Sequence, residues 1–401
     1  MNAKVVRPLK VVFFHIMREN FSGAQKNIYR LLINLDKEEV CPVLIGQAQS
    51  PLTELTSREG IETRIIPFPP ELEVFDGKIL KVNIVRSVRF IKGIWMYNKK
   101  LLREFKEIRP EVVWCDNIRT LITSYIACKF IGAKVIWNIW SEPEGKIAWI
   151  VHRIGLLLAD VINLEYARQG EKIFGRVGKR KMFKEKMVPL YTGVSDFEEM
   201  LGTDIRKELS LRSDQVLVVM ASSILAGKGQ WDLIKSVEAA RVKHQNVHLV
   251  LAGTAVDSSP QSIQYYEQVY DYVIDKDLNG YIHFIGWRSD IRDIFEGSDI
   301  YVSTSYTESF PDAVREAMLA SLPVVVTDVG GTRELVDVGK NGYLFNPGDI
   351  QTLTDHISLL VENPSLRKTM GLESKQIIDS KFSTERYARD FEKMLEQLVS
   401  Q

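Results

Sequence analysis

The sequence predicts an α/β protein with two domains, each built on a parallel β-sheet. The chain has 401 residues, which is too many for one typical hydrophobic core. Short apolar runs alternate with helical patterns, in the β-loop-α rhythm of parallel sheets. This rhythm is complete by about residue 190 and then starts again. We therefore expect one α/β domain over residues 1–193 and a second over residues 194–381.

Composition and charge place limits on the class of protein. The chain is 45% hydrophobic and 26% charged, as is usual for a soluble globular protein. Its net charge is zero, but residues 1–200 contain 32 Lys and Arg against 23 Asp and Glu, while residues 201–401 contain 20 against 29. This asymmetry predicts that the first half meets an anionic partner.

The three cysteines are Cys41, Cys115 and Cys128. Their number is odd, they form no Cys-x-x-Cys pair, and all three lie in apolar segments. We expect buried thiols in a reducing cytosol, with a catalytic cysteine as the less favoured alternative.

Neither a signal peptide nor a membrane-spanning segment is expected. The first apolar run is interrupted by His15 and Arg18, too early for a signal peptide. The most apolar segment, Ile147–Leu164, contains a histidine, an arginine and an aspartate, so it does not resemble a spanning helix. The predicted location is cytoplasmic.

Short apolar runs bounded by polar or turn-forming residues predict the strands of the first domain. These runs are Leu9–His15, Val40–Gly46, Thr63–Pro67, Val112–Cys115, Lys134–Asn138, Val161–Leu164 and Met187–Leu190. Helical periodicity predicts helices between them, notably Ala24–Leu35, Arg119–Phe130 and Ile147–Ala159. Thr192–Phe197 is interpreted as the connection to the second domain.

The segment Lys78–Arg109 has a helical pattern in which ten basic residues alternate with apolar ones. One interpretation is a helix that faces the core and keeps a solvated basic side. The other is a surface that lies on anionic lipid headgroups, with Trp95 and Tyr97 at the interface. The basic run Gly178–Lys186 belongs to the same half and supports the second interpretation.

The second domain repeats the pattern. Its predicted strands are Val216–Ala221, Val247–Ala252, Ile282–Ile285, Ile300–Ser303, Val324–Thr327 and Gly342–Phe345. Its predicted helices include Trp231–Arg241, Ser262–Ile274, Ser289–Glu296, Asp349–Glu362 and Ser365–Lys381. A last amphipathic helix covers Thr384–Val399, and its pattern does not indicate which domain it packs on.

The stretch Asp299–Leu335 carries the strongest functional signal. After the strand Ile300–Ser303 comes a polar loop with Glu308, and the helix that follows carries Glu316. Helix N-termini present free N–H groups and partial positive charge, which suit phosphate. Two carboxylates beside such a terminus indicate a nucleotide or sugar-phosphate site in which hydroxyl groups are also bound.

Two further loops of this domain end at the same predicted sheet edge. Lys228 lies between two glycines directly before a helix; glycines allow the backbone to approach a ligand, and the lysine can neutralise phosphate. Gly286 and Trp287 follow another strand, where the tryptophan could meet a base. Each signal alone is weak, because a lysine in a turn or a glutamate on a helix is usually only solvated.

In combination, these motifs resemble those of the family-four retaining glycosyltransferases of the GT-B fold. GKG, HFIGW, ESFPDAVRE, PVVVTDVGGTREL and NGYLF occur in the family's order between Val219 and Phe345. FSGA at Phe21–Ala24 is similar to the family's first loop. The resemblance implies two Rossmann-like, doubly wound domains facing across a cleft, with a C-terminal helix, residues 382–401, that crosses back to the first domain.

The resemblance also assigns roles to individual residues. Glu308 would face the donor sugar, and Lys228 would neutralise the departing diphosphate. The other implied donor-binding residues are Ser223, Gly286, Trp287, Ser309, Phe310, Pro311 and Glu316, with Glu316 on the ribose. Ser22, Gly23 and Asn138 would line the acceptor side.

The chain departs from the family pattern at two places. Ser223 stands where the family usually has an arginine that binds the diphosphate, and Arg288, Arg315 or Arg333 could compensate. The family histidine that touches the donor sugar is absent from the loops Asp116–Thr120 and Asn138–Pro143. There Asn138, Ser141 or Glu142 could replace it.

The function implied is transfer of a sugar, with retention, from a nucleotide-sugar to a glycan or lipid-linked acceptor, in bacterial-type polysaccharide or glycolipid synthesis. The alternatives are a GT-B epimerase or phosphorylase, or a non-catalytic nucleotide-sugar-binding paralogue. No metal, no cofactor and no nucleic-acid partner are expected. An anionic membrane is a further expected partner, through residues 78–109.

Overall fold

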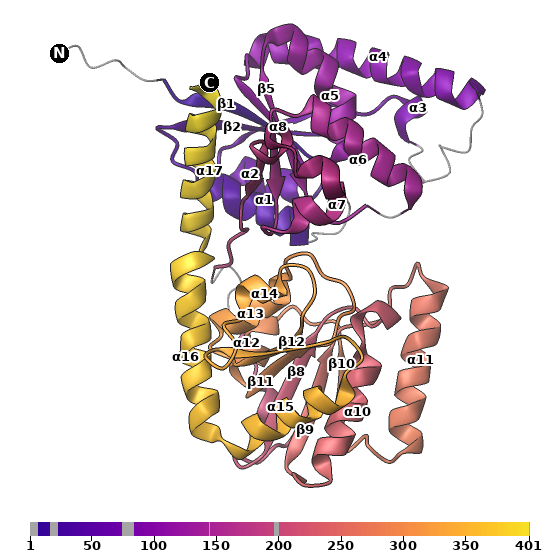
Figure 1. Ribbon diagram of the computed structural model, residues 1–401, viewed down its shortest axis with the longest axis vertical. Coiled ribbons are helices and arrows are strands. Elements are labelled where there is room, and N and C mark those ends of the chain that lie inside the picture. Colours follow the sequence, from indigo (N-terminus) through magenta and orange to yellow (C-terminus); the bar gives the residue numbers. More distant parts are fainter. Residues whose placement is uncertain (1–6, 17–22, 74–83, 144, 196–199, 401) are drawn as a thin grey trace, which may run out of the picture. The chain divides into compact units, whose positions relative to one another are not determined.

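The computed structural model describes residues 7–16, 23–73, 84–143, 145–195 and 200–400. The chain divides into two compact units: Met1–Gly193 together with Thr384–Gln401 form unit 1, and Val194–Ser383 form unit 2. Each unit has a parallel sheet and helices around it (Figure 1). The predicted two-domain α/β architecture is therefore confirmed. Unit 2 ends at Ser383, two residues beyond the predicted bound at 381.

Unit 1 contains a seven-stranded sheet in which all paired strands run parallel. The strand order is β3-β2-β1-β4-β5-β6-β7. The strands are β1 Leu9–Phe14, β2 Val40–Gly46, β3 Glu62–Ile65, β4 Val112–Cys115, β5 Lys134–Ile139, β6 Val161–Leu164 and β7 Met187–Pro189. The helices are α1 Gly23–Asn34, α2 Pro51–Arg58, α3 Pro70–Glu73, α4 Ile84–Ile108, α5 Ile118–Ile131, α6 Lys146–Leu158, α7 Gln169–Gly178, α8 Lys181–Lys184 and α17 Thr384–Val399.

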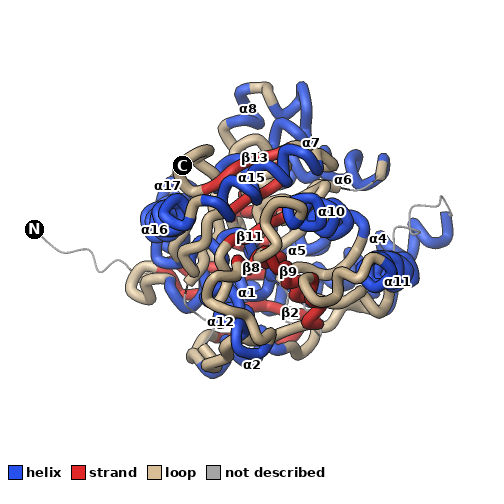
Figure 2. Tube along the Cα trace, turned by 90° about the horizontal axis from the view of Figure 1, so that it is seen from below, coloured by secondary structure: helices blue, strands red, loops and turns tan. Residues whose placement is uncertain are grey.

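Unit 2 contains a six-stranded parallel sheet in the order β10-β9-β8-β11-β12-β13. The strands are β8 Val216–Ala221, β9 Val247–Ala252, β10 Ile282–Gly286, β11 Ile300–Ser303, β12 Val324–Thr327 and β13 Gly342–Phe345. The helices are α9 Ile205–Glu208, a 3₁₀ turn Ala226–Lys228, α10 Gln230–Arg241, α11 Pro260–Asp275, α12 Ile291–Glu296, α13 Asp312–Leu319, α14 Thr332–Leu335, α15 Ile350–Glu362 and α16 Pro364–Lys381. Figure 2 shows α10 and α15 on one side of β8, β9 and β11, with α12 on the other.

Each sheet has one point at which the direction of strand addition reverses. In unit 1, β1 lies between β2 and β4, and in unit 2, β8 lies between β9 and β11. The loops that follow two such neighbouring strands leave in opposite directions, so a crevice opens outside their carboxyl ends. Ligands are therefore expected to bind after β1 and β4 in unit 1, and after β8 and β11 in unit 2.

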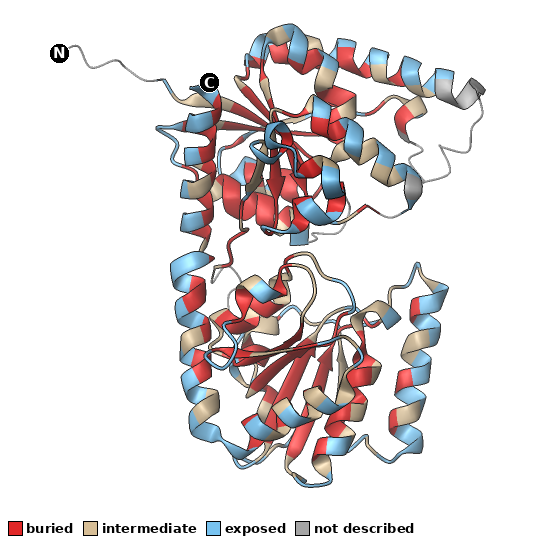
Figure 3. Ribbon diagram, viewed as in Figure 1, coloured by how far each residue is buried: buried red, intermediate tan, exposed pale blue. Residues whose placement is uncertain are grey.

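The strands supply the centre of both cores. In Figure 3 they are buried, whereas the outward sides of the helices are exposed. Trp114 on β4 and Trp137 on β5 are fully buried, and the strands consist mainly of valine, isoleucine and leucine. Parallel strands that are covered on both faces take such continuous apolar sequences, which is why their positions could be predicted.

Helix α2 was not predicted, although the sequence contains its start signal. Ser50 is the N-cap: its side chain accepts a hydrogen bond from the Thr53 amide at 3.4 Å, and its own amide donates to Thr53 Oγ1 at 2.9 Å. Pro51 occupies the first turn. A serine followed by a proline, with a hydroxyl residue at the third helical position, is a recognisable capping pattern.

The cysteines differ in their burial. Cys115 and Cys128 are buried, as predicted, but Cys41 is only partly buried, because it lies near the start of β2. Burial raises the pKa of the Cys115 thiol, and raises that of Cys128 to about 12. Both therefore stay protonated at neutral pH, which disfavours the alternative of a catalytic thiolate at either position.

Helix α17 follows α16 of unit 2 in the chain but packs within unit 1. The Phe391 ring lies 5.6 Å from the Phe13 ring of β1, and the Asp36 amide donates to the Glu392 carboxylate at 2.7 Å. Burial is the main cause that raises the Glu392 pKa. The structure gives this helix the bounds Thr384–Val399, as its amphipathic pattern predicted. Among the described residues, the helices lack the length and the apolar character that a membrane-spanning segment needs.

The packing of α17 predicts that Phe391→Ala destabilises unit 1. Removing a fully buried phenylalanine leaves a cavity and typically costs about 3–5 kcal/mol, and Phe391 has no exposed surface. Gln397→Ala, at an exposed site of the same helix, should change the free energy of unfolding by less than about 0.5 kcal/mol. Urea unfolding followed by tryptophan fluorescence measures both, and equal midpoints would contradict the assigned packing.

Candidate functional site

Lys228 and Glu308 meet at the reversal point of unit 2. Lys228 ends the 3₁₀ turn that follows β8, and Glu308 lies in the loop that follows β11. The Lys228 Nζ atom is 2.5 Å from Glu308 Oε1. Their side chains are 28% and 15% exposed, so this ion pair is partly desolvated. The structure thus brings together the two predicted catalytic residues, which are 80 positions apart in sequence.

Hydrogen bonds hold these two loops against each other. The Thr304 hydroxyl lies within hydrogen-bond distance of the Lys228 and Gly229 carbonyl oxygens, at 2.9 and 2.8 Å. The Tyr306 amide donates to the Gly227 carbonyl at 2.9 Å, and the Tyr306 hydroxyl donates to Asp232. This last bond is the main cause that raises the Tyr306 pKa to about 12. The backbone around Lys228 is therefore fixed from the Glu308 side.

The turn at Gly330 and Gly331 packs against the backbone of Glu308. Gly330 has φ +54°, and a Cβ atom there would lie 1.9 Å from the Glu308 carbonyl oxygen. The Gly331 amide donates to the Ser309 carbonyl at 2.6 Å. Only glycine satisfies both the positive φ and this close approach, so the motif DVGG supports the position of Glu308.

The predicted residues after Glu308 lead into helix α13. Phe310 is buried against the Phe382 ring, at 5.4 Å between centroids, and the Arg315 guanidinium lies over the Phe310 ring, 4.6 Å from its centroid. Arg315 also donates to the Phe310 carbonyl at 3.2 Å. Ser309 and Pro311 flank this anchored ring, so the start of α13 is held by the core.

Glu316 is half-buried on α13. The pKa of the buried Tyr301 hydroxyl is raised, first by burial and then by the negative charges of Glu308 and Glu316. Both carboxylates are therefore close enough to this buried tyrosine to influence its pKa. A carboxylate in such a position can accept hydrogen bonds from vicinal hydroxyl groups.

A second group of predicted residues lines a cavity of about 250 Å³ beside the ends of β8 and β9. Ser223 and Trp287 belong to its walls, and the Trp287 side chain is 74% exposed. Gly286 precedes Trp287 with φ +71°, and its carbonyl accepts from the Gly253 amide at 2.7 Å. An exposed aromatic ring in the wall of a small cavity can stack on a flat ring of a ligand.

Of the three arginines considered as replacements at Ser223, the structure places Arg288 in the same cavity wall. Arg288 is bound to Glu208 and Asp290, at 2.9 and 2.6 Å, and its hydrogen bond holds the Asp290 pKa well below the usual range. Arg315 is buried and paired with Asp312, and Arg333 is paired with Asp328. Of these three arginines, Arg288 is thus the one placed beside Ser223, where the family arginine is expected.

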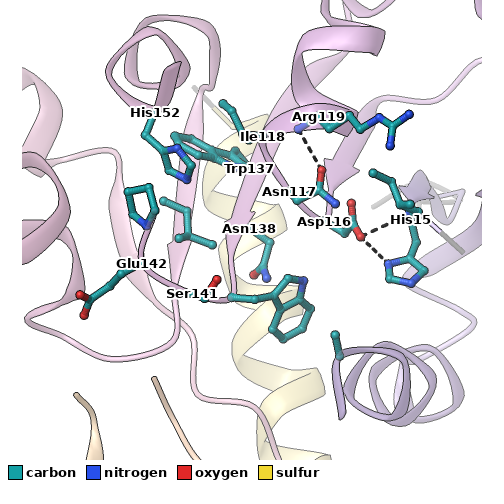
Figure 4. Close-up of a pocket in the computed structure, with 15 residues that line it drawn as sticks. His15, Asp116, Asn117, Ile118, Arg119, Trp137, Asn138, Ser141, Glu142 and His152 are labelled. Carbon is teal, nitrogen blue, oxygen red and sulfur yellow. Dashed lines mark hydrogen bonds and ion pairs between the residues drawn. The ribbon is translucent and has the colours of Figure 1, made fainter. Parts of the chain in front are cut away.

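Unit 1 has its own pocket, of about 740 Å³, at the carboxyl ends of β1, β4 and β5 (Figure 4). Asn138, predicted on the acceptor side, lines it and is buried; Ser141 and Glu142 also line it. Gly23 is the first residue of α1 and lies outside this lining. Ser22 lies outside the described residues.

A pair in this pocket was missed by the sequence analysis. His15 Nδ1 lies 2.5 Å from Asp116 Oδ2, within ion-pair distance but without the alignment of a standard hydrogen bond. Asp116 also accepts from the Thr120 hydroxyl at 3.0 Å and from the Ile16 amide at 3.3 Å. We searched for a histidine only after the fourth and fifth strands and counted His15 within the first. The structure ends β1 at Phe14, so a polar residue at the end of a buried strand was the available signal.

Metal-binding geometry is not found among the described residues, which contain no group of three or more His, Cys, Asp or Glu side chains that could hold an ion. Asp275 and Asp277, the only Asp-x-Asp pair, are exposed at the end of α11. The expectation that no metal takes part stays a prediction.

The close approach at Gly330 predicts that Gly330→Ala destabilises unit 2 more than Gly339→Ala does. Both positions have positive φ, at +54° and +80°, but a Cβ at Gly339 meets nothing within 4 Å. The strain of a non-glycine residue at such a φ costs about 1–2 kcal/mol, and only Gly330→Ala adds a clash with the backbone. Thermal unfolding compares the two variants. An equal loss of melting temperature would show that the Glu308 backbone moves aside without a cost in free energy.

Comparisons with known proteins connect unit 2 with sugar transfer. Residues 203–377 match the family described as glycosyl transferases group 1. The capsular polysaccharide biosynthesis glycosyltransferase CapM of Staphylococcus aureus is 26% identical over 184 residues, or 46% of this chain and 47% of its own length. The chain thus spans about half the length of such curated relatives. Alpha-monoglucosyldiacylglycerol synthase of Acholeplasma laidlawii is 24% identical over 92% of this chain and 97% of its own.

Solved structures match over both units. Anabaena HepE in complex with UDP has a TM-score of 0.78 and 19% identity, with 97% of this chain and 100% of that chain covered. Sucrose-phosphate synthase from Thermosynechococcus elongatus has a TM-score of 0.75 and 15% identity, with 98% and 99% covered. The predicted GT-B fold class, with two Rossmann-like domains, is confirmed by these neighbours. The segment 203–377 matches the glycosyl transferases group 1 family, and the whole chain shares the fold of glycosyltransferases of known structure.

Proposed function

We propose that this protein is a retaining glycosyltransferase that moves a sugar from a nucleotide-sugar to a glycan or lipid-linked acceptor, in the synthesis of a cell-surface polysaccharide or glycolipid. The observation that carries the proposal is the Lys228–Glu308 pair at the reversal point of unit 2, inside the segment that matches the family. The neighbour HepE has been solved with UDP and with UDP-glucose, which supports a nucleotide-sugar as donor.

The chemistry of transfer explains why a lysine and a carboxylate are needed together. When the bond between the anomeric carbon and the diphosphate breaks, negative charge grows on the phosphate and positive charge on the sugar. Lys228 stabilises the first, and Glu308 faces the second. The acceptor oxygen attacks the same face of the sugar, and its proton passes to the departing phosphate. This reaction needs neither a metal ion nor a separate catalytic base.

The remaining donor-binding residues fit the rest of such a ligand. Glu316 would accept hydrogen bonds from the ribose hydroxyls, and Trp287 would cover the base. Arg288 lines the cavity beside Ser223 and would supply part of the charge that the family arginine provides elsewhere. A charge-assisted hydrogen bond of this kind contributes about 1.5–3 kcal/mol.

Ser223 is the observation that keeps a non-catalytic, nucleotide-sugar-binding protein as the second candidate. A GT-B epimerase or phosphorylase would use the same donor site. The products separate these functions: a glycoside supports the transferase, whereas an epimerised sugar or a sugar-1-phosphate supports one of the others. Binding without any turnover, with acceptor or water, supports the non-catalytic candidate.

We predict that Lys228→Ala lowers the transfer rate by about 10²-fold, since loss of one preorganised donor to a developing charge has this effect. Glu308→Ala should cause a loss of similar size. Lys243→Ala and Glu267→Ala, at exposed positions of the same unit, are matched controls and should retain the wild-type rate. Release of the nucleotide diphosphate from a panel of nucleotide-sugars measures the rate, and wild-type activity in Lys228→Ala would refute the site.

The structure also bears on the expected membrane partner. One side of α4 packs into the core of unit 1 through Tyr97, Leu101 and Phe105, as the first interpretation of Lys78–Arg109 predicted. The placement of Tyr97 at a lipid interface was therefore wrong, because its side chain is buried. On the other side, Val88, Ile91 and Trp95 are 60–65% exposed. Residues 78–83 lie outside the described part of the chain.

Basic side chains surround these exposed apolar residues. From Ile84 to Arg103 the helix has no acidic residue, and the Lys99 ammonium lies 5.5 Å from the Trp95 ring. Helix α6 adds exposed apolar residues at helical spacing: Ile147, Ile150, Ile154 and Leu157. In Figure 1, α4, α5 and α6 follow one another on the same side of the sheet. This combination favours peripheral binding to an anionic lipid surface.

We predict that the double variant Lys92→Glu with Lys99→Glu weakens binding to phosphatidylglycerol vesicles at least about 10-fold, because each basic residue near an anionic surface contributes about 1 kcal/mol. Trp95→Ala should weaken it at both low and high salt. Val242→Ala and Lys243→Glu change an exposed apolar and an exposed basic residue of unit 2 and serve as controls. Vesicle co-sedimentation measures binding, and a wild-type protein that stays in the supernatant at low salt excludes the membrane partner.

A further inference from the structure

Thr304 connects the two loops that carry Lys228 and Glu308 in unit 2. It is the first residue after β11 and has no exposed surface. Its hydroxyl oxygen lies 2.9 Å from the Lys228 carbonyl oxygen and 2.8 Å from the Gly229 carbonyl oxygen. The two loops follow β8 and β11, which are neighbours in the sheet (Figure 1). A side chain from the Glu308 loop thus reaches the backbone of the lysine that pairs with Glu308.

The Lys228 carbonyl is the acceptor that depends on this hydroxyl. A hydroxyl group donates a single proton. The Gly229 carbonyl also accepts a hydrogen bond from the Asp232 amide, at 3.0 Å, in the first turn of α10. Within the described part of the chain, the Lys228 carbonyl has the Thr304 hydroxyl as its donor and no backbone amide besides.

Gly229 allows the two loops to approach this closely. It has φ +71°, and a Cβ atom there would lie 2.3 Å from the Thr304 carbonyl oxygen. Only glycine meets both conditions without strain. The close approach therefore places a flexible residue directly after Lys228.

The hydrogen bond from Thr304 offsets this flexibility. Lys228 lies between two glycines, and glycine restricts the backbone less than any other residue. The Lys228 amide donates to the Leu225 carbonyl at 2.8 Å, which holds the peptide group before the lysine. The Thr304 hydroxyl holds the peptide group after it. The lysine side chain therefore extends from a Cα atom that is held on both sides.

We propose that Thr304 is a positioning residue for sugar transfer, because it holds Lys228 where the ammonium group meets the departing diphosphate. The inference rests on the proposed function and deepens it by adding a residue that acts through Lys228. Misplacing a catalytic group by about 1 Å can lower a rate by about 10²-fold. Without the Thr304 hydroxyl the ammonium group is still present but less restrained, so the loss should be smaller than in Lys228→Ala.

The test compares three variants by the release of nucleotide diphosphate from the nucleotide-sugar that the wild type uses. Thr304→Val keeps the shape of the side chain without its hydroxyl and should lower the transfer rate about 10-fold. Thr304→Ala also lacks the hydroxyl and should lose at least as much. Thr304→Ser keeps the hydroxyl and should retain the rate within about three-fold. Thr354→Val removes a hydroxyl that bonds the Ile350 carbonyl at 2.8 Å on α15; it is the matched control and should retain the wild-type rate.

A double-mutant cycle separates positioning from a purely structural role. In a Lys228→Ala background, Thr304→Val should change the rate less than about two-fold, because the group through which it acts is absent. A general loss of packing would lower the rate by the same factor in both backgrounds. Melting temperatures establish that each variant is folded at the assay temperature, and Thr304→Ala replaces Thr304→Val in the cycle if the valine variant is not. Equal factors in the two backgrounds, or a serine variant as slow as the valine variant, overturn the proposal.

Binding of inorganic pyrophosphate and of UDP, measured by calorimetry without an acceptor, distinguishes this inference from the function on which it rests. If Thr304→Val weakens this binding only where Lys228 is present, while no nucleotide-sugar gives a product, the transferase function fails and the positioning role stands. If a sugar is transferred and Thr304→Val retains the wild-type rate, the function stands and the positioning role is wrong. A wild type that neither binds these anions nor transfers a sugar overturns both.

Discussion

The reversal of strand order beside β1 and beside β8 is the constraint on which both candidate sites depend. Neighbouring loops separate at these points, and each crevice receives one basic and one acidic side chain from its two sides. In unit 1 they are His15 and Asp116, and in unit 2 they are Lys228 and Glu308. The same topology thus produces a polar centre twice in one chain, with residues suited to different ligands.

The two centres differ in how far their charged and hydrogen-bonding groups are paired by other groups of the protein. In unit 2 the lysine and the glutamate neutralise each other, and glycines at 229 and 330 let the flanking backbones approach to a distance that a Cβ would forbid. In unit 1 the Asp116 carboxylate accepts hydrogen bonds from Thr120 and Ile16, but neither ring nitrogen of His15 has a hydrogen-bond partner among the described residues. In unit 2 the two charged groups are therefore paired with each other, whereas in unit 1 the described residues leave hydrogen-bonding atoms of the histidine without a partner.

Much of the fold was predictable from the sequence, because buried parallel strands are continuous apolar runs. Val216–Ala221 and Ile300–Ser303 were predicted to the residue. Helix α2 was missed because its capping signal was overlooked. The contact between Lys228 and Glu308 joins residues 80 positions apart, and no local pattern encodes it. The shared sheet edge predicted for their loops placed them near each other, and the resemblance gave them a joint role. His15 was missed because it was assigned to the first strand. The strand ends one residue earlier, at Phe14, so His15 lies in the loop that lines the pocket.

The ion pair between Lys228 and Glu308 in unit 2 affects ligand binding. An anionic diphosphate that engages Lys228 must compete with Glu308 at 2.5 Å, so part of the binding free energy is used to separate the pair. In the proposed reaction, separation would leave the Glu308 carboxylate free to face the positive charge that develops on the sugar. Under the proposed function, binding of the diphosphate to Lys228 would therefore be the event that releases the Glu308 carboxylate. A lysine without this partner would bind phosphate more tightly but would leave no charge in place for the sugar.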